Sequence, residues 1–183
     1  MSKKIIFIPG WLDQGINFPQ YETLEIWKEN IKPDVKLDCD VIIAHSLGCH
    51  FALFDWENAK DKKIVFVNPL VSNRNVFSWF WRWVKFRMGE TQSVQRKYII
   101  SPRRVARGVF YYFKFLMPDA FSRLDNMTDH NMIVIRGKKD LYFCDEESCV
   151  LLKEKKIEVI ELDEVGHLWN SKIDEEIRRI IGE

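Results

Sequence analysis

Five short apolar runs recur along the chain, each followed by polar or turn-forming residues. They are nearly continuous in hydrophobicity rather than alternating, which is typical of strands buried on both faces of a sheet. The runs cover residues 4–10, 40–46, 63–69, 132–137 and 157–163. Segments with helical periodicity accompany them at residues 21–31, 47–59, 146–156 and 171–181. This alternation predicts an α/β protein with a mainly parallel sheet of about five to six strands flanked by helices.

The segment between the third and fourth runs breaks the alternation, because it is aromatic and basic. Its first part, VFSWFWRWVKF at residues 76–86, has no clean period. On a helix its apolar residues would surround the whole wheel. On a strand, four rings would share one face: Phe77, Trp79, Trp81 and Trp83. The pattern leaves helix and strand open.

The second part of this segment predicts a helix, since Ser101 can cap its N-terminus and Pro102 suits the first helical position. At about 100° per residue, five apolar side chains would gather on one face. They are Val105, Val109, Tyr112, Phe113 and Leu116. Four cations fall on the opposite face: Arg103, Arg104, Arg107 and Lys114. We therefore expect a basic amphipathic helix.

Composition indicates one globular domain spanning residues 1–183, with 46% hydrophobic and 30% charged residues. The net charge of +1 is unevenly spread, because ten basic residues and only one acidic residue lie between Arg74 and Lys114. Such asymmetry predicts that the middle segment meets an anionic partner or lies against the acidic remainder of the chain.

The first apolar run, Ile5 to Ile8, is too short for the core of a signal peptide, and no stretch reaches the roughly 18 apolar residues of a spanning helix. Together with this, the four cysteines predict free thiols in a reducing compartment. They are Cys39, Cys49, Cys144 and Cys149. The cytoplasm is the expected location.

Ser46 follows the second apolar run and precedes a helix that is apolar nearly all round. Small residues stand two positions before and two after it, Ala44 and Gly48, which lets the chain turn sharply from strand to helix and present the hydroxyl above the sheet edge. Reactive groups collect at this carboxyl edge of a parallel sheet. The pattern indicates a nucleophile, and the alternative is a serine that only caps the helix.

A serine nucleophile needs a base that a third group orients. His45 and His50 are close in sequence, but at a tight turn and one helical turn away their side chains should point elsewhere, so packing or surface roles are expected. His130 precedes a strand and so lies at the wrong end of the sheet. His167 comes directly after the last strand, at the carboxyl edge, and is the predicted base.

The orienting carboxylate is expected at the same edge, where Asp140 follows the fourth run. Asp145 and Glu146 are competitors, better placed as first-turn acids of the next helix. An oxyanion intermediate would also need N–H donors. Leu47, directly after the serine, offers one, and Trp11, after Gly10 in the loop following the first strand, offers the other.

With these residues in this order, the chain resembles the α/β-hydrolase superfamily, most of all its small carboxylesterases and lipase-like serine hydrolases. AHSLG corresponds to the nucleophile elbow, RGKKD to the acid loop, VGHLW to the histidine loop and IPGW to the oxyanion loop. The resemblance covers nearly all of the chain except the middle segment. It implies Ser46 as nucleophile, His167 as base and then acid, Asp140 as its orienter, and Trp11 and Leu47 as oxyanion donors.

The resemblance also implies a helical lid-like insertion at about residues 72–130, with rings that line an acyl pocket: Trp79, Trp81, Trp83 and Tyr112. The implied reaction is hydrolysis of a carboxylic ester or thioester of apolar acyl character through an acyl-enzyme on Ser46, with no cofactor. Two departures stand out. Ala44 replaces the usual Gly, and only one clear helix lies between Gly10 and Val41, where the family has a strand between two helices. A weak strand at residues 34–38 could supply the missing one, which would lie outboard of the first strand.

Several alternatives remain open. The fold could be kept by a binding or regulatory protein with a silent triad, or the same triad could serve an amidase or peptidase. The basic, aromatic middle segment could rest on anionic lipid, or it could pack its rings on the core with its cations in solvent. No nucleic-acid signature accompanies it, and the Cys and His spacings do not fit structural zinc, so neither nucleic acid nor metal is expected. The sequence pattern favours neither a monomer nor an oligomer.

Overall fold

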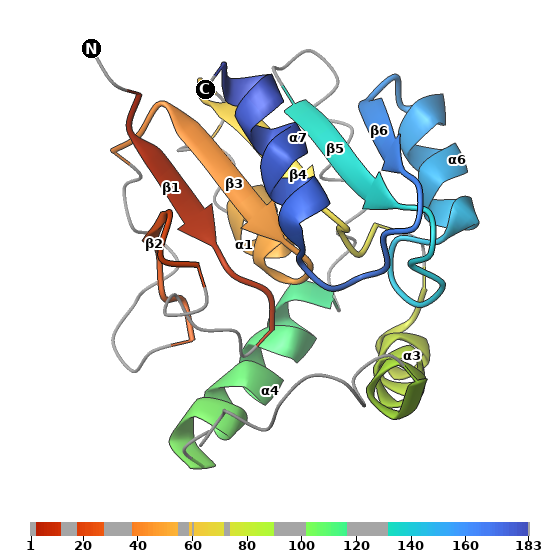
Figure 1. Ribbon diagram of the computed structural model, residues 1–183. Coiled ribbons are helices and arrows are strands. Elements are labelled where there is room, and N and C mark those ends of the chain that lie inside the picture. Colours follow the sequence, from red (N-terminus) through yellow and green to blue (C-terminus); the bar gives the residue numbers. More distant parts are fainter. Residues whose placement is uncertain are drawn as a thin grey trace.

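The computed structural model describes residues 3–11, 18–27, 38–54, 59, 61–71, 74–89, 102–116 and 132–182. Within them, one sheet has the strand order β2-β1-β3-β4-β5-β6, and every neighbouring pair is parallel (Figure 1). The strands are β1 (Ile5–Ile8), β2 (Glu22–Thr23), β3 (Val41–His45), β4 (Lys63–Val67), β5 (Met132–Gly137) and β6 (Glu158–Leu162). The α/β class and all five predicted strands are confirmed.

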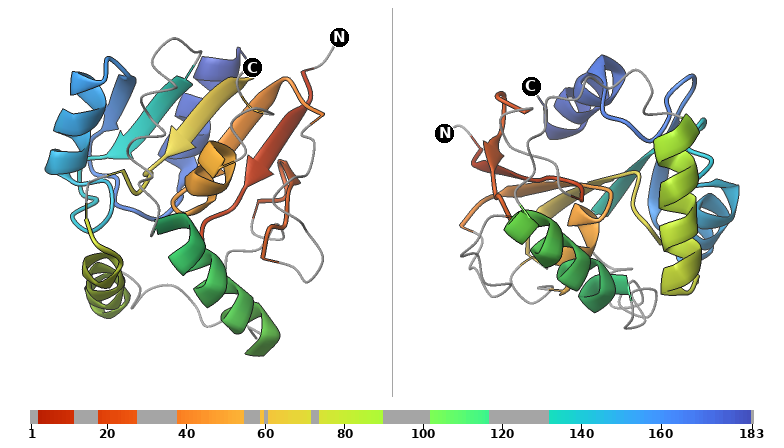
Figure 2. Two further views of the ribbon diagram at one scale, coloured as in Figure 1. Left: turned by 180° about the vertical axis from the view of Figure 1, so that it is seen from behind. Right: turned by 90° about the horizontal axis from the view of Figure 1, so that it is seen from below.

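The helices of the described residues lie on both faces of the sheet and beyond the carboxyl ends of its strands (Figures 1 and 2). They are α1 (Gly48–Phe54), α3 (Val76–Gly89), α4 (Pro102–Leu116), α6 (Glu146–Glu154) and α7 (Ser171–Ile181). Helix α7 covers one face, and α1 and α6 cover the other (Figures 1 and 2). The helices predicted after the second run, before the last strand and at the end of the chain are confirmed. The open question at residues 76–86 is settled in favour of a helix, and the strand interpretation was wrong.

One predicted helix, at residues 21–31, was partly wrong. Its beginning forms β2, which pairs with β1 at the edge of the sheet, with Ile6 opposite Glu22. The N–H of Leu24 also donates to the carbonyl of Phe7 at 2.8 Å. Pairing with an open strand edge has here outweighed local helical periodicity. The strand outboard of β1 therefore comes from this segment; of the alternative at residues 34–38, only Asp38 is described, outside any strand.

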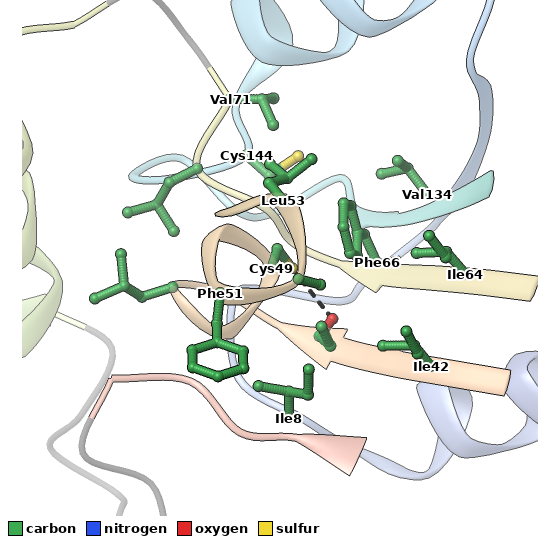
Figure 3. Close-up of a cluster of buried hydrophobic side chains, with 14 of the residues drawn as sticks. Ile8, Ile42, Cys49, Phe51, Leu53, Ile64, Phe66, Val71, Val134 and Cys144 are labelled. Carbon is green, nitrogen blue, oxygen red and sulfur yellow. Dashed lines mark hydrogen bonds between the residues drawn. The ribbon is translucent and has the colours of Figure 1, made fainter. Parts of the chain in front are cut away.

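Two apolar layers hold the sheet between its helices. Under α1, Ile42 and Phe66 of the sheet and Phe51 of the helix belong to one buried apolar cluster, and the thiol of Cys49 donates to the carbonyl of Ala44 at 3.2 Å (Figure 3). On the opposite face, α7 contributes three fully buried isoleucines: Ile173, Ile177 and Ile181. These layers fix the sheet, and with it the loops at its carboxyl edge.

Helices α3 and α4 follow β4 in the chain and precede β5, and both lie beyond the carboxyl ends of the strands (Figures 1 and 2). The predicted start of α4 at Pro102 is confirmed, but only part of its predicted apolar face is buried. Tyr111 and Tyr112 are buried, whereas Val109 and Phe113 are exposed. The helix packs through its two tyrosines and leaves part of its apolar face outside.

All four cysteines are buried free thiols. Burial raises the pKa of the Cys49 and Cys144 thiols well above the usual value, so both stay protonated. Within the described ranges, no helix is both long and apolar enough to cross a membrane.

Candidate active site

Ser46 lies on a tight turn between β3, which ends at His45, and α1, which begins at Gly48. Its φ of 53° is left-handed, which few residues other than glycine adopt. Its N–H donates to the carbonyl of Val67 at 2.9 Å. A side chain at Gly48 would collide with the carbonyl oxygens of Ile8 and Pro9. The turn therefore needs glycine there, and it packs directly against the loop that follows β1.

Ser46, His167 and Asp140 form one hydrogen-bonded chain. The Ser46 Oγ lies 2.9 Å from His167 Nε2, and His167 Nδ1 lies 2.6 Å from Asp140 Oδ2. All three side chains are buried. Because a carboxylate only accepts, Nδ1 carries the imidazole proton, and Nε2 is left to accept the serine hydroxyl proton. The three residues predicted as nucleophile, base and orienting acid are thus brought together.

The Asp140 carboxylate is fully buried, yet it is held in its ionised form. Burial alone would raise its pKa, but the charge and hydrogen bond of His167 and two backbone N–H groups outweigh this and lower the pKa below its usual value. Those N–H groups belong to Phe143 and Cys144, each donating at 3.0 Å. Tyr142 N–H donates as well, at 3.2 Å. The acid loop folds around the carboxylate and fixes it toward His167.

Asn68, directly after β4, ties the acid loop to the histidine loop. Its buried side-chain amide donates to the carbonyls of Gly166 at 3.0 Å and His167 at 3.1 Å, and its Oδ1 accepts the N–H of Gly137 at 2.8 Å. The carbonyl of His167 also accepts from His45 Nε2 at 3.0 Å. The backbone of the candidate base is therefore held by two buried side chains.

Comparison with solved structures places this arrangement in a known fold. An α/β-hydrolase enzyme from a Medee basin deep-sea metagenome library superposes with a TM-score of 0.67 at 11% identity, over 97% of this chain and 87% of the other. A deformylase from Pseudomonas putida S16 gives 0.63 at 11% identity, over 91% and 86%. A structure from the thaumarchaeon Nitrososphaera gargenis, from work on its carboxylesterases, gives 0.54 at 12%, over 97% and 89%. The chain has the α/β-hydrolase fold. No protein-family model and no curated protein matches the sequence.

α/β-hydrolases carry their nucleophile on a strand-to-helix turn that is called the nucleophile elbow. Ser46 lies on a turn of this kind between β3 and α1, here called the elbow. The prediction that neither neighbouring histidine contacts the serine as its base agrees with the geometry, since His45 and His50 are buried with Nε2 on the carbonyls of His167 and Leu70. His130 lies outside the described residues. Asp145 caps α6 and forms ion pairs with Arg74 and Arg82, and Glu146 stands in the first turn of α6.

The predicted oxyanion donors lie on adjacent loops. Leu47 directly follows Ser46, at the start of α1, and is buried. Trp11 lies in the loop that follows β1, here called the β1 loop, and Gly48 packs against the beginning of this loop. The first turn of α1 and the β1 loop therefore lie side by side. The roles of the N–H groups of Leu47 and Trp11 stay predictions.

The four rings predicted to line an acyl pocket have different surroundings, because on a helix alternate residues do not share a face. Trp83 packs 4.9 Å from Trp11, and Tyr112 packs 5.1 Å from the same ring (centroid distances). Trp79 is buried against Phe143. Trp81 is 57% exposed and points outward. Trp83 and Tyr112 remain the candidates for contact with an acyl group.

Two phenylalanines that the sequence pattern did not single out lie beside the candidate base. The ring of Phe143 is 4.3 Å from the His167 ring, and that of Phe86, from α3, is 5.3 Å away. Asn68 was missed as well. Its signal was available, because it is a polar residue directly after a buried strand at the carboxyl edge. Among the described residues, no three His, Cys, Asp or Glu side chains are grouped closely enough to hold a metal ion.

Proposed function

We propose that the protein is a serine hydrolase that cleaves a carboxylic ester or thioester of apolar acyl character through an acyl-enzyme on Ser46. The observation that carries the proposal is the continuous chain of short hydrogen bonds from Ser46 Oγ through His167 to Asp140. A buried serine held at left-handed φ on a strand-to-helix turn supports it, as does the likeness in fold to α/β-hydrolase enzymes.

In the proposed acylation, Ser46 Oγ attacks the acyl carbon while His167 Nε2 takes its proton. The new positive charge on His167 is stabilised by the ionised Asp140, whose lowered pKa keeps it charged. The carbonyl oxygen becomes an oxyanion, for which the N–H groups of Leu47 and Trp11 are the proposed donors. His167 then gives its proton to the leaving alcohol or thiol.

In the proposed deacylation, His167 takes a proton from water, which attacks the acyl-serine. Collapse of the second oxyanion releases the carboxylic acid and restores Ser46 with its proton. The direct packing of the elbow against the β1 loop, through Gly48, supports the same pair of N–H donors for both oxyanions.

The apolar acyl class is supported by the rings around the site. Phe86 and Phe143 flank His167, and Trp11, Trp83 and Tyr112 form a contiguous aromatic cluster beside the elbow loop. Burial raises the pKa of Tyr112 strongly, so this phenol stays neutral, and its hydroxyl donates to the carbonyl of Val76 at 3.3 Å. Such neutral, ring-lined surroundings favour an apolar acyl group over a charged one.

The test is labelling with a fluorophosphonate probe, which reacts only with activated serines. We expect the protein to be labelled and the Ser46→Ala variant to be unlabelled. Ser171→Ala, at the exposed start of α7, is the matched control and should label like the parent. Equal labelling of Ser46→Ala, or no labelling of the folded parent, would favour the catalytically silent alternative.

Matched nitrophenyl esters, phenyl thioesters and anilides of one acyl group then separate the substrate classes. We expect hydrolysis of the oxygen ester and thioester at rates at least about a hundredfold above that of the anilide, because the amine is the poorer leaving group. Faster cleavage of the anilide than of the esters would indicate an amidase or peptidase that uses the same three residues.

A further inference from the structure

The exposed apolar side chains of the described residues are concentrated on α3 and α4. Of the nine large ones, four lie on α3 and three on α4: Phe77, Phe80, Trp81, Met88, Val109, Phe110 and Phe113. Phe77 is 75% exposed and Phe110 62%. Such a concentration of exposed apolar side chains on two helices is uncommon on a protein that contacts only water.

On α3 these side chains form a single stripe. At about 100° per residue, Phe77, Phe80, Trp81 and Met88 fall within one roughly 100° sector of the helix. Trp79 and Phe86, the buried residues of α3, lie on the opposite side. Two exposed cations border the stripe, Lys85 beyond Trp81 and Arg87 beyond Phe80. Helix α3 therefore has an apolar outer face with a positive charge along each edge.

Helix α4 has a similar apolar face, with cations along one edge only. Val109, Phe110 and Phe113 fall within one sector of about 100°. Arg107 and Lys114 lie along the edge next to Phe110, with their charged ends over the Tyr111 ring, at 5.3 and 5.9 Å from its centroid. Both cations are half-buried, and the Arg107 guanidinium also donates to the Tyr111 hydroxyl at 3.4 Å, so they lie beside the exposed apolar face of α4 and not on it.

Charge points to the nature of the partner. Neither α3 nor α4 contains an aspartate or glutamate. Arg82 forms an ion pair with Asp145 at 3.0 Å, on the inner side of α3. Lys85 and Arg87 are exposed and border the outer face. Exposed rings bordered by cations are what an anionic bilayer surface binds, since the rings enter the headgroup region and the cations meet lipid phosphates. A fluid surface can also accommodate two separate stripes that no single groove would match.

We propose that the outer faces of α3 and α4, here called the α3–α4 surface, bind an anionic phospholipid membrane. It is defined by its exposed apolar and cationic residues, which are Phe77, Phe80, Trp81, Lys85, Arg87, Met88, Val109, Phe110 and Phe113. Binding through this surface holds the end of the molecule that bears the carboxyl edge of the sheet against the lipid (Figures 1 and 2).

The inner sides of the same helices contact the candidate active site. Phe86 of α3 packs beside His167, and Trp83 of α3 and Tyr112 of α4 both pack on Trp11. An amphiphilic acyl substrate in the membrane would have only a short path to Ser46. This last step rests on the proposed function, whereas membrane binding itself does not.

The test is sedimentation of the Ser46→Ala protein with vesicles of phosphatidylcholine alone and with about a quarter phosphatidylglycerol. Using this variant keeps membrane binding separate from catalysis. We expect binding to the anionic vesicles that is at least about tenfold tighter and that weakens with added salt. Equal binding to both vesicles, or binding to neither, would overturn the proposal. Binding to a labelled single-stranded oligonucleotide without binding to vesicles would replace lipid with nucleic acid.

Two variants test the surface itself. Lys85→Glu with Arg87→Glu should weaken anionic-vesicle binding about thirtyfold, at about fivefold for each cation removed. Lys172→Glu with Arg179→Glu, on exposed positions of α7, makes the same change in net charge and should weaken anionic-vesicle binding no more than about twofold.

Phe80→Ser with Trp81→Ser tests the apolar side chains and should weaken binding to the same vesicles about tenfold. Val150→Ser, at an exposed apolar position of α6, should weaken it little. Equal losses in test and control variants, with circular dichroism unchanged, would overturn the assignment to α3 and α4.

Discussion

The side-chain amide of Asn68 donates to the backbone carbonyl of His167 at 3.1 Å. The same amide reaches Gly166, and its oxygen accepts from Gly137, so one buried residue fixes the distance between the acid loop and the histidine loop. It does so at a φ of 47°, a left-handed conformation that asparagine tolerates better than most residues. Asn68 acts on the proposed reaction through His167 and is therefore a positioning residue.

Replacing Asn68 by glycine tests this role. Glycine keeps the left-handed backbone free of strain but removes all three side-chain hydrogen bonds. We expect kcat on a nitrophenyl ester to fall about ten- to a hundredfold, because His167 loses its fixed position, while KM changes little. The purely structural alternative would lower stability without separating kcat from KM. A rise in KM at unchanged kcat would contradict the positioning role.

Asp140→Asn tests the orienting acid. The amide cannot stabilise a positively charged His167, and it favours the imidazole tautomer that places the proton on Nε2. We expect kcat to fall about a thousand- to ten-thousandfold. Asp145→Asn, which changes a neighbouring carboxylate that caps α6, is the control and should keep most activity. Similar losses of kcat in both variants would mean that the substitutions disturb the fold and would contradict a specific role of Asp140.

Asp140 also gives a prediction for stability against pH. Its pKa is lower in the folded protein than in the unfolded chain. At a pH between these two pKa values, the unfolded chain binds more protons than the folded protein. The folded state therefore loses stability as pH falls through this window. The contribution is fully present above the unfolded value of about 3.9 and is lost as pH drops through the folded value. Urea unfolding from pH 7 to 3 should show the parent losing more stability than Asp140→Asn below about pH 4. Parallel curves would contradict the lowered pKa.

Gly48→Ala tests the contact that brings the elbow to the β1 loop. The added methyl group would collide with two backbone carbonyls, which cannot move without shifting β1 or α1. We expect a loss of about 1–3 kcal/mol in the free energy of unfolding. Gly182→Ala is the comparison, since there only the left-handed φ of 81° is strained, at about 1 kcal/mol, and no close contact arises. A smaller loss at Gly48 than at Gly182 would contradict the close approach.

Trp83→Ala tests the acyl contact. Trp83 packs on Trp11 beside the elbow loop, whereas Trp81 is mainly exposed on the outer face of α3. On a series of soluble nitrophenyl esters, Trp83→Ala should change the preferred acyl length, and Trp81→Ala should leave it unchanged. The same shift in both variants, or none in either, would remove Trp83 from the proposed acyl contact.

The strands and the candidate triad could be predicted because the relevant signals are local and topological. Each buried strand is a continuous apolar run, and parallel strands bring their carboxyl ends to one edge, so residues far apart in sequence such as Ser46 and His167 could be placed together. The order of residues along the chain identified the other two members, because Asp140 follows β5 and His167 follows β6.

What could not be predicted depends on tertiary contacts. The strand β2 exists because β1 has an open edge, which no pattern within residues 21–31 reveals. Helix α3 carries apolar residues both on the side that is buried against the core and on the side that is exposed. The hydrophobic pattern of its sequence therefore showed no helical period. The position of Phe86 beside His167 follows from how α3 packs, which depends on the same contacts.

The most direct test of Ser46 as the nucleophile is to trap the acyl group on it. The protein is mixed with a nitrophenyl ester, quenched in acid during turnover and digested, and the peptide that contains Ser46 is examined by mass spectrometry. We expect an acyl adduct on Ser46 that builds up within the first turnover and is absent from Ser46→Ala. Ester hydrolysis with no adduct on Ser46, or an equal rate of hydrolysis by Ser46→Ala, would contradict this role of Ser46.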